Sequence, residues 1–217
     1  MTEPGTVLTF YSYKGGVGRL FALANVASAL ALWGYKVLCV DWDLDAPGLT
    51  HYFNTSEDRK GLIELIADLT CENEAKPDWH DFTEIIDYSR YEGRLHLIRA
   101  GSSGNFYFQM AQNTDWVALY ENHGLPEVLE LLRTQWTSKY DFILLDSRTG
   151  VTDIGAICTM FMPDILFFVF TTSNQSLNGS IKTVNVLKRR AANLMSIDRR
   201  FMQCQYYRDS TPGPNTR

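Results

Sequence analysis

The sequence predicts an α/β fold in which a mostly parallel β-sheet is sandwiched by helices. Apolar, strand-like runs alternate along the chain with segments of helical periodicity, as the crossover connections of parallel sheets require. Polar clusters follow the ends of these runs, namely KGGVGR, DWDLD, DSRTG and TTSNQS. Ligands bind at the carboxyl ends of the strands in such folds, so this placement supports both the fold class and a site at that edge.

The first half of the chain gives two strands and two helices. Residues 6–13 are rich in β-branched and aromatic residues, which favour a strand, and the glycines of KGGVGR end it. Residues 20–34 predict a helix that is packed on most sides and closes at a glycine. Residues 35–43 form a nearly continuous apolar run that ends in acid, which is typical of a buried parallel strand. Residues 60–70 predict a short amphipathic helix.

The second half repeats the alternation, and only residues 102–122 fit no pattern. The chain after Met202 is polar and rich in proline, which predicts a flexible or truncated tail. The further expected elements are strands at 94–101, 140–150 and 164–172 and helices at 124–136 and 176–195.

Composition indicates one globular domain rather than a nucleic-acid-binding or membrane protein. The 217 residues are 45% hydrophobic and 21% charged, with a formal net charge of -5. The four cysteines are scattered without a C-x-x-C pair, which indicates a reducing compartment. The polar start is unlike a signal peptide, and the apolar run ILFFVF is too short to span a bilayer. We therefore expect a cytoplasmic protein.

The C-terminal end is basic although the chain as a whole is acidic. From Asn178 to Arg217 there are eight Lys and Arg against two Asp. A solvated helix face explains such a run, and nonspecific DNA association is a second, weaker hypothesis. The residues that would contact DNA are Lys182, Lys188, Arg189, Arg190, Arg199 and Arg200.

The stretch YKGGVGRL combines a preceding strand, a glycine-rich loop and a following helix, which together form an anion site. The usual phosphate loop is G-x-x-x-x-G-K-[ST]. Gly18 fits the second glycine of that pattern, Tyr13 replaces the first, and Lys14 comes early in the loop. The alternative is a purely structural turn between strand and helix.

Three aspartates within DWDLD follow the second strand. Like charges so close together are costly unless a cation or a role in activating water compensates them, although aspartates also cap turns. We favour a functional role for Asp41 and Asp43 and a turn-supporting role for Asp45. Asp146 ends the apolar run FILLD, which fits an acid close to a metal.

KGGVGR followed by ALANVASALALWGYKVLCVDWDLDAPGL resembles the deviant Walker A P-loop ATPases of the ParA/MinD group. The likeness is closer to the bacterial branch with the KGGVGR motif, which DSRTGVTDIGAICT and TTSNQSLNG also resemble. It covers roughly residues 6–195. The resemblance implies a P-loop NTPase fold, with an ATPase-like domain at 1–200 and a tail at 201–217.

The resemblance assigns roles to the loop residue by residue. Lys14 matches the lysine that reaches the nucleotide of a dimer partner. Gly15, Gly16, Val17 and Gly18 match the loop around the β-phosphate, Arg19 the loop lysine, and Leu20 the magnesium-binding hydroxyl residue.

The resemblance also assigns roles to the acids. Asp43 matches the acid that positions the attacking water, Asp41 a magnesium or loop partner, and Asp146 the Walker B acid near magnesium. The implied function is an ATP-binding molecular switch with slow, Mg²⁺-dependent hydrolysis coupled to formation of a homodimer. An effector domain or partner protein is the expected target of the switch.

Leu20 is the main departure from the family pattern, because leucine offers magnesium no oxygen. One expectation is that water fills the vacancy and hydrolysis slows. Another is that Leu20 points into the core and the loop register differs. The alternative function is a catalytically degenerate nucleotide-sensing or scaffold module. Two further roles stay open. Arg148 is expected either to contact phosphate or a neighbouring subunit or to pair with Asp153. Asn174 and Gln175 either face the nucleotide or belong to a plain loop that enters the helix.

Overall fold

The computed structural model describes residues 3–55, 59–71, 77–147, 149 and 161–193. Within these ranges, six strands form one sheet in the order β3-β4-β2-β5-β1-β6, and every neighbouring pair except β3–β4 is parallel. The predicted mostly parallel sheet between helices is therefore confirmed. The strands are β1 (Thr6–Tyr11), β2 (Val37–Asp41), β3 (Glu84–Ile85), β4 (Leu95–Ile98), β5 (Phe142–Asp146) and β6 (Ile165–Phe168).

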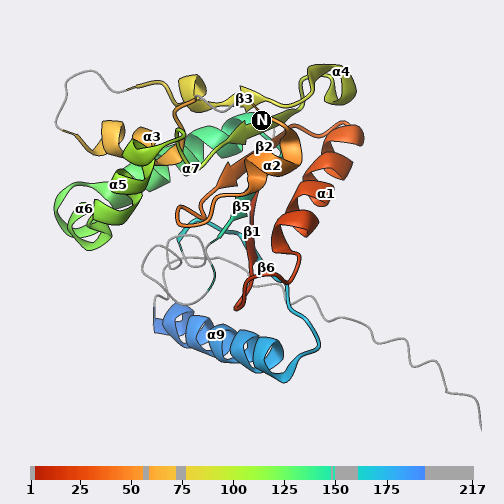
Figure 1. The fold of residues 1–217 in the computed structure, drawn as a ribbon, viewed down its shortest axis with the longest axis vertical. Coiled ribbons are helices and arrows are strands. Elements are labelled where there is room, and N and C mark those ends of the chain that lie inside the picture. Colours follow the sequence, from red (N-terminus) through yellow and green to blue (C-terminus); the bar gives the residue numbers. More distant parts are fainter. Residues whose placement is uncertain (1–2, 56–58, 72–76, 148, 150–160, 194–217) are drawn as a thin grey trace, which may run out of the picture.

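Helices cover both faces of the sheet. Figure 1 shows α1 on one side, α3 and α7 on the other, and α9 next to β6. The helices are α1 (Arg19–Leu32), α2 (Leu49–Phe53), α3 (Leu62–Thr70), the 3₁₀ helix η1 (Trp79–Phe82), α4 (Tyr88–Tyr91), α5 (Asn105–Asn113), α6 (Trp116–Asn122), α7 (Leu125–Lys139) and α9 (Asn174–Asn193).

The observed elements match the expected ones in type and order, with shorter strands. Residues 102–122, for which no element was predicted, contain α5 and α6. The side chain of Asp115 caps α6 by accepting a hydrogen bond from the N–H of Ala118 at 2.9 Å. The other elements that were not predicted have five residues or fewer (α2, η1, β3 and α4), too few to establish a period.

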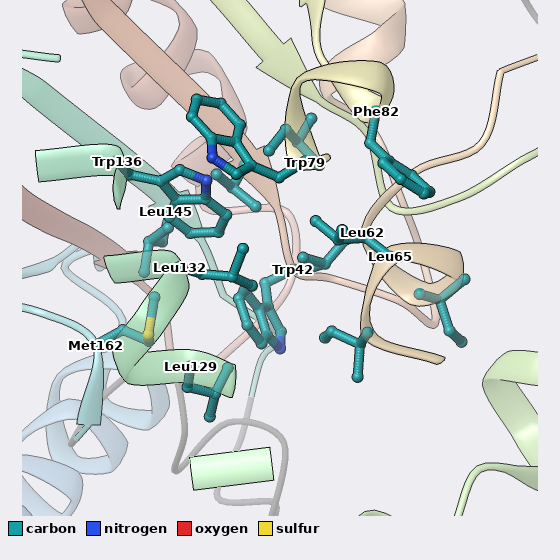
Figure 2. Packing of buried hydrophobic residues seen from close by; sticks show 14 of the residues in the cluster. Trp42, Leu62, Leu65, Trp79, Phe82, Leu129, Leu132, Trp136, Leu145 and Met162 are labelled. Atoms are coloured by element: carbon teal, nitrogen blue, oxygen red, sulfur yellow. The ribbon is translucent and has the colours of Figure 1, made fainter. Parts of the chain in front are cut away.

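Alternation along the strands separates the two large clusters of the core. On β2, Leu38 and Val40 belong to the cluster under α3 and α7, whereas Val37 and Cys39 belong to the cluster under α1. Trp42 continues the first set and is fully buried. Figure 2 shows its indole among Leu62, Leu129 and Leu132. Trp42 thus anchors the carboxyl end of β2 in the core, next to the acidic residues of the DWDLD segment.

The last described helix, α9, packs against the edge of the sheet formed by β1 and β6. Tyr11, Leu166 and Leu187 form a small buried cluster there, and the Tyr11 hydroxyl is 3.3 Å from the Thr183 hydroxyl. This contact holds the middle of α9 against the end of β1.

Several predictions fall outside the described residues and stay predictions. They include the domain boundary at residue 200, the tail at 201–217, and the roles of Arg148, Asp153, Arg199 and Arg200. In the part of the chain that the structure describes, no helix is long and apolar enough to cross a membrane.

Candidate functional site

The glycine-rich loop connects β1 to α1 at the carboxyl edge of the sheet. Gly16 and Gly18 have φ values of 73° and 86°, in the left-handed region that favours glycine. No atom lies within 4 Å of the position that a Cβ would take at either residue, so backbone conformation, not crowding, requires glycine there. Lys14 and Gly15 are exposed and Val17 is half-buried. The loop therefore opens to solvent along its length.

The helix that follows, α1, has no side-chain cap at its N-terminus. Gly18 is the N-cap of α1 and has no side chain to accept a hydrogen bond from the first turn. The first turn also carries no acidic residue. Free N–H groups and the helix dipole together favour an anion at this end of α1.

Strand register brings the predicted acids together. Asp41 of β2 and Asp146 of β5 are direct partners in adjacent parallel strands. Both are fully buried, and Asp43 is nearly so. Because Trp42 points into the cluster under α3 and α7, its neighbours Asp41 and Asp43 face the side covered by α1. Asp41, Asp43 and Asp146, separated by up to 105 residues in sequence, thus share one face of the sheet.

Arg19 joins two of these acids. Its Nε donates to Asp146 Oδ1 at 2.7 Å and its Nη2 to Asp146 Oδ2 at 3.0 Å. The same Nη2 donates to Asp43 Oδ2 at 2.8 Å. The arginine is only 7% exposed, and its Nη1 is buried with no hydrogen-bond partner among the described residues. The guanidinium of the phosphate-loop arginine is therefore directed toward the acids.

The pKa values of Arg19 and Asp146 are shifted because charged groups lie close together in a buried place. Burial lowers the pKa of Arg19, but Asp146 and Asp43 outweigh it and raise the pKa above its ordinary value. Burial raises the pKa of Asp146 well above its ordinary value, and the charge of Arg19 opposes that shift. Bidentate contact with a guanidinium is the geometry of an ionised carboxylate. Arg19 is thus the group that stabilises the charged form of Asp146.

Asp41 holds the turn that follows β2. Its Oδ2 accepts hydrogen bonds from the N–H groups of Gly48 and Leu49, both at 3.0 Å, and its Oδ1 from the N–H of Asp43 at 3.3 Å. Burial raises the pKa of Asp41 to about 6, while these backbone N–H groups act in the opposite direction. Asp45, expected to support the same turn, is exposed.

Leu20 lies over this turn. It is half-buried and packs against the cluster under α1. A Cβ added to Gly48 would lie 2.7 Å from Leu20 Cδ1, so the leucine side chain rests on the Gly48 backbone. Leu20 consequently links the loop helix to the turn that carries Asp43.

Helix α9 contacts the start of the glycine loop. The ring of Tyr13 lies against Gly179, where a Cβ would come within 2.0 Å of Tyr13 Cδ1. Lys14 Nζ donates to Gln175 Oε1 at 3.3 Å, and Asn174 is exposed beside it. Gln175 was among the residues left open by the sequence. Gly179 was not singled out, although a glycine inside a predicted helix is itself a signal of close packing.

Magnesium fits poorly between these acids as they are arranged. Magnesium prefers oxygen ligands, and Leu20 has none. Both oxygens of Asp146 are held by Arg19, and both oxygens of Asp41 accept backbone hydrogen bonds. Across the described ranges, no group of three or more His, Cys, Asp or Glu side chains is arranged to hold a metal.

The basic C-terminal group is only partly described. Lys182 is exposed on α9. The side chains of Lys188, Arg189 and Arg190 lie outside the described part of the structure, so the proposed DNA contact stays a prediction.

Comparison with known proteins places this geometry in a family. A family model described as an AAA domain matches residues 5–197. An uncharacterized ATP-binding protein of Methanocaldococcus jannaschii is 26% identical over 184 residues, which cover 84% of this chain and 59% of that protein. The septum site-determining protein MinD of Escherichia coli K12 is 25% identical over 190 residues, covering 86% of this chain and 62% of MinD. The chain thus spans about 60% of the length of these curated relatives.

Solved structures agree on the fold. MinD of Pyrococcus horikoshii, complexed with Mg-ADP, has a TM-score of 0.65 and 24% identity, covering 86% of this chain and 66% of that chain. A Cyanothece McdA variant complexed with ATP has a TM-score of 0.68 and 20% identity, covering 92% of this chain and 69% of that chain. At these identities the likeness establishes the fold alone.

Proposed function

Since the chain belongs to the AAA domain family of ParA/MinD-like P-loop ATPases, we propose that it is a molecular switch operated by ATP. The observation that carries the proposal is the buried Nη1 of Arg19, the first residue of α1, which has no hydrogen-bond partner among the described residues. A buried N–H donor needs an acceptor, and a phosphate oxygen at the helix N-terminus supplies one. The ATP-binding name of the archaeal relative and the nucleotides in the MinD and McdA complexes support this choice of ligand.

In the proposed complex, the exposed backbone from Gly15 to Gly18 surrounds the phosphates. Arg19 contributes positive charge, and Lys14 leaves Gln175 to reach the nucleotide of a second copy of the chain. Lys14 can do so because its hydrogen bond to Gln175, at 3.3 Å, is exposed to solvent. ATP binding thereby favours the dimer, and hydrolysis returns the chain to the monomer.

Asp43 is the proposed catalytic acid. Its Oδ2 is held by Arg19, whereas among the described residues its Oδ1 accepts a long hydrogen bond of 3.4 Å from the N–H of Ala46. A carboxylate fixed through one oxygen presents the other in a defined direction, which suits the orientation of an attacking water. We expect hydrolysis to be slow because Leu20 contributes no oxygen to the site.

A second candidate function is a nucleotide sensor or scaffold that does not hydrolyse ATP. Two observations favour it: Leu20 packs on Gly48 instead of offering a hydroxyl, and Arg19 engages both Asp43 and Asp146. In this alternative, binding alone changes the shape of the loop and its contact with α9. An effector domain or a separate partner protein would respond to that change.

The test begins with calorimetric titration of ATP into the purified chain, followed by measurement of phosphate release. Turnover that disappears in Asp43→Ala but persists in Asp45→Ala, an exposed acid on the same turn, supports the switch. Binding without turnover, in the wild type and in Leu20→Thr alike, supports the sensor. The absence of ATP binding by a folded protein would refute both.

Dimerisation has its own test. Light scattering with ATP is expected to give a dimer for the wild type and a monomer for Lys14→Ala. Gln175→Ala is the matched control, because it frees Lys14 without removing it. A Gln175→Ala protein that fails to dimerise like Lys14→Ala would contradict the proposed reach of Lys14 across the dimer.

A further inference from the structure

The acids at the carboxyl edge of the sheet are already matched by a cation that belongs to the chain. Arg19 is bound to Asp146 through two nitrogens and to Asp43 through one, at 2.7 to 3.0 Å. All three side chains are at least nine-tenths buried. Buried carboxylates are costly unless they are paired, so this guanidinium is the main electrostatic support of the site.

The arrangement depends on an arginine. Nε and Nη2 face the carboxylates, and the planar fork leaves Nη1 directed elsewhere. Lysine offers one compact ammonium and has no second nitrogen to face a different group. Arg19 can therefore bind Asp146 and Asp43 and still present N–H groups to a third partner.

One nitrogen of Arg19 is left for a third partner. Nη1 of Arg19 is buried and has no acceptor among the described residues. It belongs to the first residue of α1, a 14-residue helix whose N-terminus carries neither a capping side chain nor an acidic residue in its first turn. Two independent features, the unmet donor of Arg19 and the uncapped N-terminus of the helix that Arg19 begins, thus each favour a phosphate oxygen.

We propose that this site binds ADP and ATP without needing a divalent cation, because Arg19 neutralises Asp146 and Asp43 and also contacts a phosphate oxygen. The inference rests on the proposed nucleotide-binding function and specifies its metal requirement. The neighbouring side chains support this inference. Leu20 supplies no metal ligand, and both carboxylate oxygens of Asp41 accept hydrogen bonds from backbone N–H groups of the turn that follows β2. Arg19 thus takes over the charge compensation that a metal ion would otherwise provide.

The test compares calorimetric titrations of ADP and ATP in excess EDTA and in excess MgCl₂. For the wild type, affinity in EDTA is expected to stay within about fivefold of that in MgCl₂, or to exceed it. The matched variant carries Arg19→Lys and Leu20→Thr, which together restore the usual K-[ST] pair. This double variant is expected to bind more tightly in MgCl₂ than in EDTA by about tenfold or more.

A wild-type affinity that rises by about tenfold or more with MgCl₂ would overturn the inference and leave the proposed function intact. The absence of binding in both solutions, by a protein that is folded by circular dichroism, would refute the proposed function and the inference with it. Should the double variant not fold, the comparison of the wild type in EDTA and in MgCl₂ decides by itself, because it depends on no substitution.

Discussion

Arg19 and Asp146 form a bidentate ion pair between the first residue of α1 and the last residue of β5, with N–O distances of 2.7 and 3.0 Å. The pair connects residues 127 apart in sequence and is shielded from water. It fixes the start of the loop helix to the centre of the sheet, because β5 lies between β1 and β2. A phosphate that engages Arg19 is therefore coupled to the rigid part of the fold.

Arg19→Ala is expected to lower the free energy of unfolding by about 3–5 kcal/mol, because it leaves Asp43 and Asp146 buried without their cation. Urea unfolding measures the change. Arg94→Ala is the control, since Arg94 pairs with an exposed Glu92 and is expected to cost less than about 1 kcal/mol. Equal losses in the two variants would contradict the importance assigned to the buried pair.

Asp41→Ala is expected to release the turn at Gly48 and Leu49, with a cost of about 1–3 kcal/mol for the buried N–H groups left without an acceptor. Hydrogen exchange should show faster exchange of these two amides. Asp41→Asn keeps one acceptor oxygen and should lose less protection than alanine. If both amides stay protected in Asp41→Ala, Asp41 does not hold the turn.

Much of this site follows from the sequence, because strand alternation and register are local rules. Acids that end apolar runs predict that Asp41 and Asp146 meet at one edge, and the alternation around Trp42 places Asp43 beside them. The sequence does not predict the direction of the Arg19 side chain, because an arginine in a phosphate loop is equally suited to face a phosphate or a carboxylate.

The contact between α9 and the glycine loop could not be predicted from the sequence either. It joins Lys14 to Gln175 and Tyr13 to Gly179, residues more than 160 positions apart, and it depends on how α9 packs against β1 and β6. Residues 102–122 were missed for another reason. Their two helices have nine and seven residues, and the hydrophobic pattern is too short to reveal a period.

His96 gives a pH-dependent prediction away from the site. Burial lowers the pKa of His96, while its hydrogen bond with the Gly93 carbonyl acts in the opposite direction. The folded state therefore prefers the neutral imidazole, whose Nε2–H donates to that carbonyl while Nδ1 faces the Tyr140 hydroxyl at 2.6 Å. Below the unfolded value of 6.5 the unfolded chain binds more protons, so stability should fall as the pH drops below about 6.5.

Unfolding curves of the wild type and His96→Asn between pH 8 and 5 measure this contribution. Stability of the wild type relative to the variant should decline as the pH falls through this range. A difference that stays constant with pH would mean that His96 titrates alike in the folded and unfolded chains.

Gly179→Ala tests the contact between α9 and the glycine loop. Whether it raises or lowers the free energy of unfolding depends on Tyr13. Alanine favours a helix over glycine by about 1 kcal/mol. The added methyl group, however, would come within 2.0 to 2.3 Å of the Tyr13 ring and must displace it. We expect Gly179→Ala to destabilise the wild type and to stabilise a Tyr13→Ala background, with a coupling of about 1–2 kcal/mol in a double-mutant cycle.

The same substitution should weaken ATP binding, because Tyr13 directly precedes Lys14 and the glycine loop. Val186→Ala, an exposed position later on α9, is the matched control and should leave ATP affinity unchanged. A stabilised Gly179→Ala protein with wild-type ATP affinity would mean that Tyr13 moves aside without disturbing the loop. Loss of affinity in Gly179→Ala, restored in Tyr13→Ala/Gly179→Ala, would instead attribute the effect to the displaced ring, since both proteins carry the same change in α9.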